Sequence, residues 1–573
     1  MPCRSPRRDA RESTETRGSR RLTAPQLLAL AVCYQCVALV SFAPVSDYAH
    51  LGSHIASGDP ALLAWTFGWV SHAVLSGEPL FDANIFYPTH GSLAYAEHHL
   101  GTALWGVPLF GVTGNAVLTY HVLRLVAPAL NALAAHVWLH RVTRDHRAAA
   151  LGALVYGLAA PRVIYGGHVP QHWTFCLPLL LVALDAWIEN PTWRRATLVF
   201  ALGVGQVFTT SYVAVMTALA CGIFVAAWQL HSWRTGRLDA GRVGRLVLQG
   251  GVIACAGAAL AFPLLKPYAV LDELAAPGLA ANYSLTLGAF VRPLTGSLAA
   301  TLWGCVGASS APIGAEQNQF LGWIAIALAV AGAADAIRRG GEARRWAAFL
   351  IVLCGAGIAL SLGPAARGGF APFDLVTRVP GLRLFRVPAR FTFLVLTGLS
   401  GLVAFGGLAV CRWWPRRAAV VALAIGGAML VEWTLPDSRL PWQWDATPPR
   451  IYDALAGLEP GALVSLPCYR RTTDAARESE YMVYSTHHWR PIVNGYGRHD
   501  PIGSHPVVGA VTAFPGPNSA IRMRALGIRF VILHSARYAD GAEAVLGEAR
   551  ASTDFEVVAR EGHDYLFRVR PGP

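Results

Sequence analysis

Long apolar segments recur through residues 1–435 and are separated by short clusters of arginine. Of the 573 residues, 54% are hydrophobic and only 14% are charged, whereas about a quarter of the residues in a soluble domain are charged. Each apolar segment is about 20 residues long, which is enough to cross the roughly 30 Å hydrocarbon core of a bilayer. The sequence therefore predicts a mainly α-helical, multi-pass membrane protein.

The arginine clusters predict how the chain crosses the membrane. Basic flanks stay on the cytoplasmic side, and seven arginines precede the first apolar segment, so the N-terminus is expected in the cytoplasm. Counting from there gives about 11 transmembrane helices, each even-numbered one ending at an arginine cluster, with the C-terminus outside. The expected spans are 22–43, 115–139, 148–165, 174–188, a hairpin over 196–230, 246–268, two helices ending near 338 and 362, 392–410 and 418–435.

The formal net charge of +13 does not indicate nucleic-acid binding. The arginines are confined to short clusters between apolar segments, where they set the topology and contact anionic headgroups. The partner that the composition predicts is therefore the lipid bilayer, and no nucleic-acid partner is expected.

The same boundaries predict the domain organisation. Residues 1–21 are expected to form a basic cytoplasmic tail, and residues 22–435 the transmembrane domain with an exported loop at 44–114. Proline and tryptophan crowd residues 441–449, and short β-like runs follow at 462–466, 529–534, 555–559 and 565–569. Residues 436–573 are therefore expected to form a soluble α/β domain on the extracytoplasmic face of the inner or plasma membrane.

The exported loop is acidic and contains no lysine or arginine. Asp47, Asp59 and Glu97 are candidate catalytic residues, because a carboxylate beside the membrane can take a proton from an acceptor or hold a divalent cation such as Mg²⁺ or Mn²⁺. Asp59 and Glu97 abut apolar helical segments, which favours a function, whereas solvation of an exported loop explains Asp47 better. His98 and His99 follow Glu97 and are candidate substrate-binding residues.

A polar turn at 166–173 separates two expected spans on the exported side. It contains His168, Gln171 and His172, which would face the same cavity as the acidic loop. Histidine is suited to phosphate contact or proton relay, although a plain interfacial turn explains these residues equally well.

The exported segment 363–391 keeps several arginines on the side of the membrane that basic residues normally avoid. Arg386 and Arg390 lie just before an expected span. A guanidinium group binds phosphate through paired hydrogen bonds, so both residues are candidate ligands of a phosphate at the bilayer surface. Pairing with lipid headgroups or with the acidic loop is the alternative.

The overall organisation is similar to that of the GT-C class of glycosyltransferases. Shared features are the first span with its N-terminus inside, the large exported loop with a membrane-proximal carboxylate, the many helices and the exported C-terminal domain. Six short motifs more closely resemble a group of bacterial membrane proteins. They occupy residues 58–65, 81–88, 97–101, 386–391, 494–496 and 526–531.

The GT-C resemblance implies transfer of a sugar from a polyprenyl-phosphate donor to a lipid, glycan or protein acceptor on the extracytoplasmic face. Enzymes of this class use a carboxylate of the first exported loop as base or metal ligand. The matching position is Asp59, with Asp47 as runner-up. The paired acidic motif that usually follows the first span is absent, because Asp47 is followed by Tyr48.

The resulting hypothesis is an inverting glycosyltransferase. Arg386 and Arg390 would hold the donor phosphate, and Asp59 would deprotonate the acceptor hydroxyl. One alternative is a non-catalytic protein that binds or transports a polyprenyl-linked envelope glycan, which would need the arginines but not Asp59 as a base. Another is a scaffold for envelope assembly. Ion-coupled transport is disfavoured, because the expected spans contain few ionisable residues.

Overall fold

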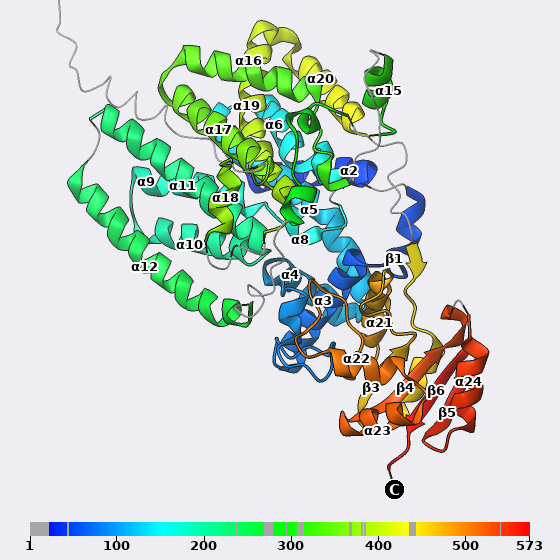
Figure 1. Ribbon diagram of the computed structural model, residues 1–573. Coiled ribbons are helices and arrows are strands. Elements are labelled where there is room, and N and C mark those ends of the chain that lie inside the picture. Colours follow the sequence, from blue (N-terminus) through cyan, green and yellow to red (C-terminus); the bar gives the residue numbers. More distant parts are fainter. Residues whose placement is uncertain are drawn as a thin grey trace, which may run out of the picture.

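The structure is a computed structural model that describes residues 22–42, 45–164, 166–236, 239–268, 279–293, 295–305, 315–365, 369–379, 382, 385–434, 443–538 and 540–572. Helices make up most of the chain before residue 434, and a small α/β domain follows at one end of the helical part (Figure 1). This confirms the predicted fold class. The basic tail 1–21 lies outside the described residues.

Seven helical stretches of the described chain are long and apolar enough to cross a membrane. They contain α2 (Ala24–Phe42), α5 (Ala116–Thr143), α8 with α9 (Val169–His172 and Cys176–Glu189), α11 (Ser211–Arg234), α12 (Ala240–Leu265), α17 (Gly341–Ser361) and α19 (Thr392–Trp413). The protein is therefore an integral membrane protein.

Helices of 13 to 17 residues occupy the other four predicted spans. They are α6 (His146–Leu158), α10 (Trp193–Val207), α16 (Trp323–Arg339) and α20 (Ala418–Trp433). A helix crossing the hydrocarbon core needs about 17 to 25 residues, so the total of 11 spans and their orientation remain predictions.

The remaining helices are short or lie between the predicted spans. The exported loop contributes α3 (Asp59–Ser76) and α4 (Leu100–Thr113), and α7 (Ala160–Ile164) precedes the polar turn. Further along the chain are α14 (Leu279–Asn282), α15 (Leu298–Cys305) and α18 (Pro372–Thr377).

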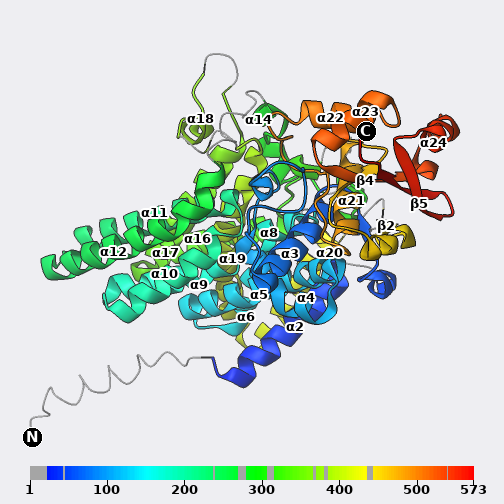
Figure 2. The same cartoon turned by 90° about the horizontal axis from the view of Figure 1, so that it is seen from below.

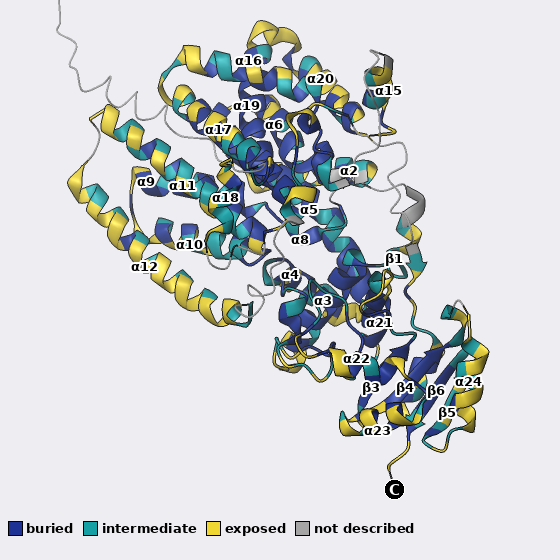
Figure 3. Cartoon of the chain, viewed as in Figure 1, coloured by how far each residue is buried: buried dark blue, intermediate teal, exposed yellow. Residues whose placement is uncertain are grey.

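Helix α19 lies at the centre of the helical part, with 94% of its candidate span buried. It packs against α6, α16 and α17, and Figure 3 shows it as a dark core. Helix α12 is the opposite case, because only 6% of its span is buried within the protein. Figure 2 shows α10, α11 and α12 extending side by side away from the α/β domain, so lipid rather than protein would cover most of α12.

Two glycines allow α16 and α19 to approach backbone to backbone. A Cβ atom added at Gly332 would overlap the Leu402 carbonyl oxygen, and one added at Gly406 would overlap the Leu328 carbonyl oxygen. Small residues at such contacts permit close van der Waals packing, which is a main source of helix association in lipid.

We expect Gly406→Ala to destabilise the helical part by about 1–3 kcal/mol, because the added methyl group forces two packed backbones apart. Gly427→Ala on α20 is the matched control, since a Cβ there meets nothing within 4 Å. The thermal unfolding midpoint of the purified protein in detergent measures both effects. Equal midpoints for the two variants would contradict this packing.

The C-terminal α/β domain is built on a four-stranded sheet with the order β3-β4-β6-β5. Strand β3 (Ala462–Leu466) is parallel to β4 (Ile528–His534), while β6 (Asp564–Val569) is antiparallel to both β4 and β5 (Phe555–Glu561). All four strands coincide with the predicted β-like runs. The helices of this domain are α21 (Glu478–Ser485), α22 (His505–Thr512), α23 (Pro517–Ala525), α24 (Ala542–Ala551) and the 3₁₀ helix η8 (Arg450–Gly457).

The exported loop and the C-terminal domain form one body. Strand β1 (His54–Ala56) of the loop pairs with β2 (Gln443–Asp445), just before the C-terminal sheet. Helices α3 and α21 pack together, and one hydrophobic cluster contains Trp65 and Trp69 of α3 as well as Tyr481 and Met482 of α21. The start of α3 is therefore fixed by residues from the end of the chain.

A buried carboxylate, Glu478 at the start of α21, organises the interior of this domain. It accepts hydrogen bonds from the Tyr469 amide (2.5 Å), the Asn494 side chain (2.9 Å) and the Gly495 amide (3.2 Å). Burial raises the pKa of Glu478 to about 7, although these donors and Arg470 act in the opposite direction. Burial therefore outweighs the hydrogen bonds.

The raised pKa of Glu478 predicts a pH-dependent stability. Between the ordinary carboxyl pKa of 4.5 and the folded value of about 7, the folded state binds the proton more tightly than the unfolded state. The free energy of unfolding therefore falls by about 3 kcal/mol as the pH rises through this window and is constant above it. Hydrogen exchange of β3 and β4 amides in the full-length protein, corrected for intrinsic rates, measures this fall. Glu478→Gln, whose side chain is neutral at every pH, should remove the slope, and an unchanged slope would contradict the assignment.

Candidate active site

Asp59 lies on the first turn of α3, at a position fixed by its neighbours in the sequence. Gly58 has φ 85° and ψ −134°, a conformation open essentially only to glycine, and Pro60 suits the first turn of a helix. The Gly58 amide donates a hydrogen bond to the Ser479 hydroxyl of α21 at 2.8 Å. The helix therefore starts at Asp59, whose side chain is 47% exposed.

Two side chains from distant parts of the sequence contact the Asp59 carboxylate. The Tyr496 hydroxyl donates to Oδ1 at 3.2 Å, and His168 Nδ1 lies 3.6 Å from Oδ2. The turn that carries His168 is held by Tyr120, whose hydroxyl donates to the Gly167 carbonyl at 2.9 Å. The structure thus brings together the acidic loop, the predicted polar turn and the C-terminal domain.

His168 also lies within the electrostatic reach of Arg390. Burial lowers the pKa of His168, and Arg390 lowers it further, while Asp59 and Glu316 raise it; the net shift is downward. Arg390 itself forms an ion pair with Glu316 at 3.2 Å and lies over the ring of Tyr212. A neutral imidazole therefore separates the half-exposed carboxylate from the arginine.

Glu97 contacts the beginning of a membrane helix. Its Oε1 accepts a hydrogen bond from the Ser211 amide at 2.9 Å, at the N-terminus of α11, and its Oε2 lies 4.0 Å from His99 Nε2. Burial alone would raise the pKa of Glu97, but His99, the Ser211 amide, Arg498 and His98 together lower it. The ionised carboxylate is favoured at the positive end of the helix dipole.

His98 and His99 are buried between their own loop and the residues around Thr209 and Tyr268. His98 Nδ1 accepts from the Leu100 amide at 3.0 Å, and burial lowers the pKa of His98 to about 4. His99 Nδ1 lies 2.9 Å from the Thr209 carbonyl oxygen and would donate to it. Glu97 and His99 both have positive φ, of 67° and 45°, and such strained residues are concentrated at functional sites.

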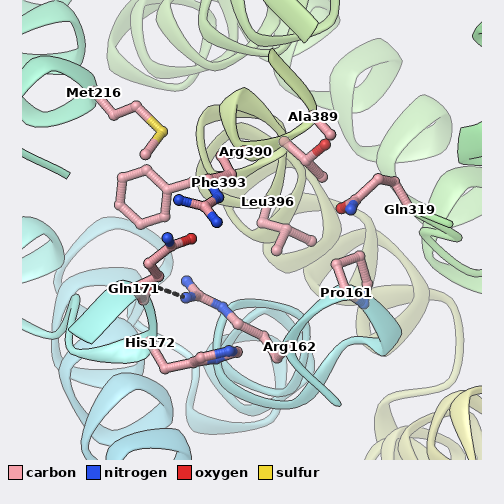
Figure 4. A pocket seen from close by; sticks show the side chains of 11 residues that line it. Pro161, Arg162, Gln171, His172, Met216, Gln319, Ala389, Arg390, Phe393 and Leu396 are labelled. Atoms are coloured by element: carbon pink, nitrogen blue, oxygen red, sulfur yellow. Dashed lines mark hydrogen bonds between the residues drawn. The ribbon is translucent and has the colours of Figure 1, made fainter. Parts of the chain in front are cut away.

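Gln171 and His172 line a pocket whose lining does not include Asp59. In Figure 4, the Arg162 and Arg390 guanidinium groups both point into this pocket. The lining residues are Pro161, Arg162, Gln171, His172, Met216, Gln319, Ala389, Arg390, Thr392, Phe393 and Leu396. The polar turn therefore contributes His168 to one side of the site and Gln171 with His172 to the other.

Arg162 is a buried cation that sequence reasoning did not single out. It is 4% exposed, and its guanidinium donates to the Tyr156 carbonyl (3.0 Å), the Thr174 hydroxyl (3.1 Å) and the Gln171 carbonyl (3.5 Å). These acceptors are neutral, and no carboxylate among the described residues pairs with Arg162. A buried charge without a counter-charge is costly. An anion entering the pocket would compensate it.

Arg386 and Arg498 extend the positive charge toward Asp59. Arg386 is exposed, and its amide donates to the Tyr212 hydroxyl at 2.9 Å. Burial lowers the pKa of Arg498, Tyr212 and Glu97 raise it, and Arg386 and Arg390 lower it, for a net decrease. Three arginines from two domains are thus close enough to influence one another, and Arg498 was not among the predicted residues.

The structure describes neither the side chain of Asp47 nor, among the described residues, a group of side chains that could bind a metal ion. Asp47 belongs to the 3₁₀ helix η1 (Val45–His50), but its side chain lies outside the described residues. No group of three or more His, Cys, Asp or Glu side chains in the described part of the chain is arranged to hold a metal ion. Oxygen ligands from several carboxylates suit Mg²⁺, whereas Asp59 has a histidine, a tyrosine and arginines around it. This donor set does not fit Mg²⁺ or Mn²⁺.

Comparison with known proteins identifies relatives in fold. The chain matches no model of a known protein family and no curated protein. Among solved structures, the arabinofuranosyltransferase AftD from Mycobacteria is similar with a TM-score of 0.52 and 15% identity, over 97% of this chain and 42% of AftD.

Two further structures have lower TM-scores. ArnT from Cupriavidus metallidurans bound to undecaprenyl phosphate gives 0.47 at 15% identity, covering 95% of this chain and 98% of ArnT. The oligosaccharyltransferase of Archaeoglobus fulgidus gives 0.46 at 13% identity, covering 90% and 70%. The likeness to AftD, which this chain spans for less than half of its length, shows that the protein has the GT-C-like fold expected from its overall organisation.

Proposed function

We propose that the protein is a membrane glycosyltransferase that moves a sugar from a polyprenyl-phosphate donor to a lipid, glycan or protein acceptor on the extracytoplasmic face. The central observation is that His168 lies 3.6 Å from Asp59 and also feels the charge of Arg390. A base for the acceptor and cations for the leaving phosphate thus lie around His168. Sugar transfer from a phosphate donor requires both. The fold shared with an arabinofuranosyltransferase supports the proposal.

The donor phosphate would bind on the arginine side of the site. Arg390 and Arg162 point into the same pocket, and Arg386 lies exposed outside it. The Arg390 charge is partly compensated by Glu316, whereas Arg162 has only neutral acceptors among the described residues. Guanidinium groups in a partly dry pocket stabilise the negative charge that develops on the leaving phosphate.

The acceptor would be activated on the Asp59 side. Asp59 takes the proton of the acceptor hydroxyl while the hydroxyl oxygen forms a bond to the anomeric carbon of the sugar. The bond from that carbon to the phosphate oxygen breaks, and polyprenyl phosphate leaves with the electron pair. Asp59 then releases the proton to water. A single displacement of this kind inverts the anomeric configuration.

Glu97, His98, His99, Gln171 and His172 would have supporting roles. Glu97 and the two adjoining histidines connect the acidic loop to the N-terminus of α11 and to Thr209. Gln171 and His172 line the pocket proposed for the phosphate. These residues would shape the site without taking the acceptor proton.

We expect Asp59→Asn to lower kcat at least a hundredfold, because a positioned general base contributes about 10² to 10⁴. Donor affinity should stay unchanged, since the arginine side is intact. The measurement is transfer of label from radiolabelled polyprenyl-phosphate sugars to membrane extract by protein in nanodiscs. Glu78→Gln, an exposed carboxylate of the same loop, is the control. Retained transfer by Asp59→Asn would refute this base assignment, and donor binding by wild type without transfer would favour the binding or transport alternative.

We expect Arg162→Met and Arg390→Met to weaken donor binding about ten- to a hundredfold each, because a hydrogen bond to a charged partner contributes about 1.5–3 kcal/mol. Folding should survive at position 162, where an apolar side chain removes a buried charge. Arg147→Met, whose arginine pairs with Asp145 at 2.6 Å, is the control. Fluorescence-detected binding of a polyprenyl phosphate gives the affinities. Unchanged affinity in both variants would place the phosphate elsewhere.

A further inference from the structure

We infer that Tyr496 is a positioning residue for Asp59, so that the C-terminal domain completes the reacting site instead of only adjoining it. The inference rests on the proposed function. Its basis is the hydrogen bond from the Tyr496 hydroxyl to Asp59 Oδ1 at 3.2 Å, between residues 437 positions apart. His168 contacts the other carboxylate oxygen. Tyr496 therefore orients the carboxylate through Oδ1, and the acceptor proton would go to Oδ2, which lies beside His168.

Tyr496 is itself held rigidly by the interior of its domain. The Tyr496 amide donates to the Met482 sulfur at 3.1 Å, and the preceding Gly495 amide donates to Glu478 at 3.2 Å. A Cβ atom at Gly495 would come within 2.5 Å of the Phe86 ring, so the segment is clamped between α21 and the exported loop. A side chain on such a fixed segment has little freedom to leave its partner.

The backbone before Asp59 is held by the same helix. The Ser57 hydroxyl donates to Glu480 at 2.7 Å, and the Gly58 amide donates to Ser479 at 2.8 Å. Glu480 is fixed in turn by an ion pair with Arg537 at 2.7 Å. Both partners of the Tyr496–Asp59 hydrogen bond are thus held in place by contacts with α21. Small errors in the placement of a reacting group cost large factors in rate.

The electrostatic surroundings keep Tyr496 a hydrogen-bond donor. Burial raises the pKa of Tyr496, Asp59 raises it further, and Arg386 acts in the opposite direction without reversing the shift. The phenol therefore remains protonated at neutral pH and cannot serve as the base itself. Its role is to donate to the carboxylate that does.

The test is Tyr496→Phe, which removes the hydroxyl and keeps the ring. We expect kcat for sugar transfer to fall about tenfold, because one hydrogen bond to a charged group is lost. The KM and the binding affinity for the polyprenyl-phosphate donor should stay within twofold of wild type, since no phosphate contact changes. Tyr481→Phe is the matched control, because its hydroxyl donates to the Pro467 carbonyl in the same domain and not to Asp59. Its kcat should be unchanged.

A second variant keeps the inference testable if Tyr496→Phe folds poorly. Ser479→Ala removes the acceptor of the Gly58 amide and should also lower kcat without changing donor affinity. If Asp59→Asn loses transfer but Tyr496→Phe and Ser479→Ala both keep the wild-type kcat, the inference about Tyr496 is wrong. The proposed function is then unaffected. Retained transfer in Asp59→Asn would overturn the base assignment and the inference together, whereas donor binding without transfer by wild type would overturn the proposed function.

Discussion

The structure of the candidate site depends on one short junction, where the start of α3 meets α21. Gly58 and Ser57 donate to Ser479 and Glu480, and the apolar faces of the two helices share one core. Every other part of the site is placed relative to this junction. The polar turn reaches Asp59 through His168, and the arginine pocket is joined to it through the same turn.

The charged side chains of the site differ in how deeply they are buried. The proposed base is half exposed, so it can exchange protons with water, whereas Arg162 is almost fully buried. The first arrangement suits a group that must gain and lose a proton in each turnover. The second suits a group that stays charged throughout and is useful only when an anion is present.

The sequence predicted the helical architecture well, because apolar length and arginine clusters report directly on membrane crossing. The four strands of the C-terminal sheet were also found from their β-like composition. Four of the predicted spans are helices of only 13 to 17 residues, which periodicity alone could not reveal. Asp59 was recognisable because it directly precedes an apolar helix.

Residues that reach the site from afar were harder to find. Tyr496 belongs to the motif 494–496 and Arg498 follows it, but only the fold places both residues beside the acidic loop. Arg162 did leave a signal, because it is the only basic residue between Arg147 and Arg194 and lies inside an expected span. An ionisable residue within a membrane segment is by default a functional candidate. Gln171 and His172 were predicted, and they line the arginine pocket, whose lining does not include Asp59.

The pairing of β1 with β2 has a consequence for how the protein is made. Strand β1 precedes most of the helices in the sequence, whereas its partner β2 follows α20. Until β2 and α21 have been synthesised, Asp59 lacks both the strand that anchors its loop and the helix that holds its backbone. A chain truncated before residue 443 would leave residues 44–114 without these contacts. The site can therefore assemble only after the C-terminal α/β domain has been synthesised.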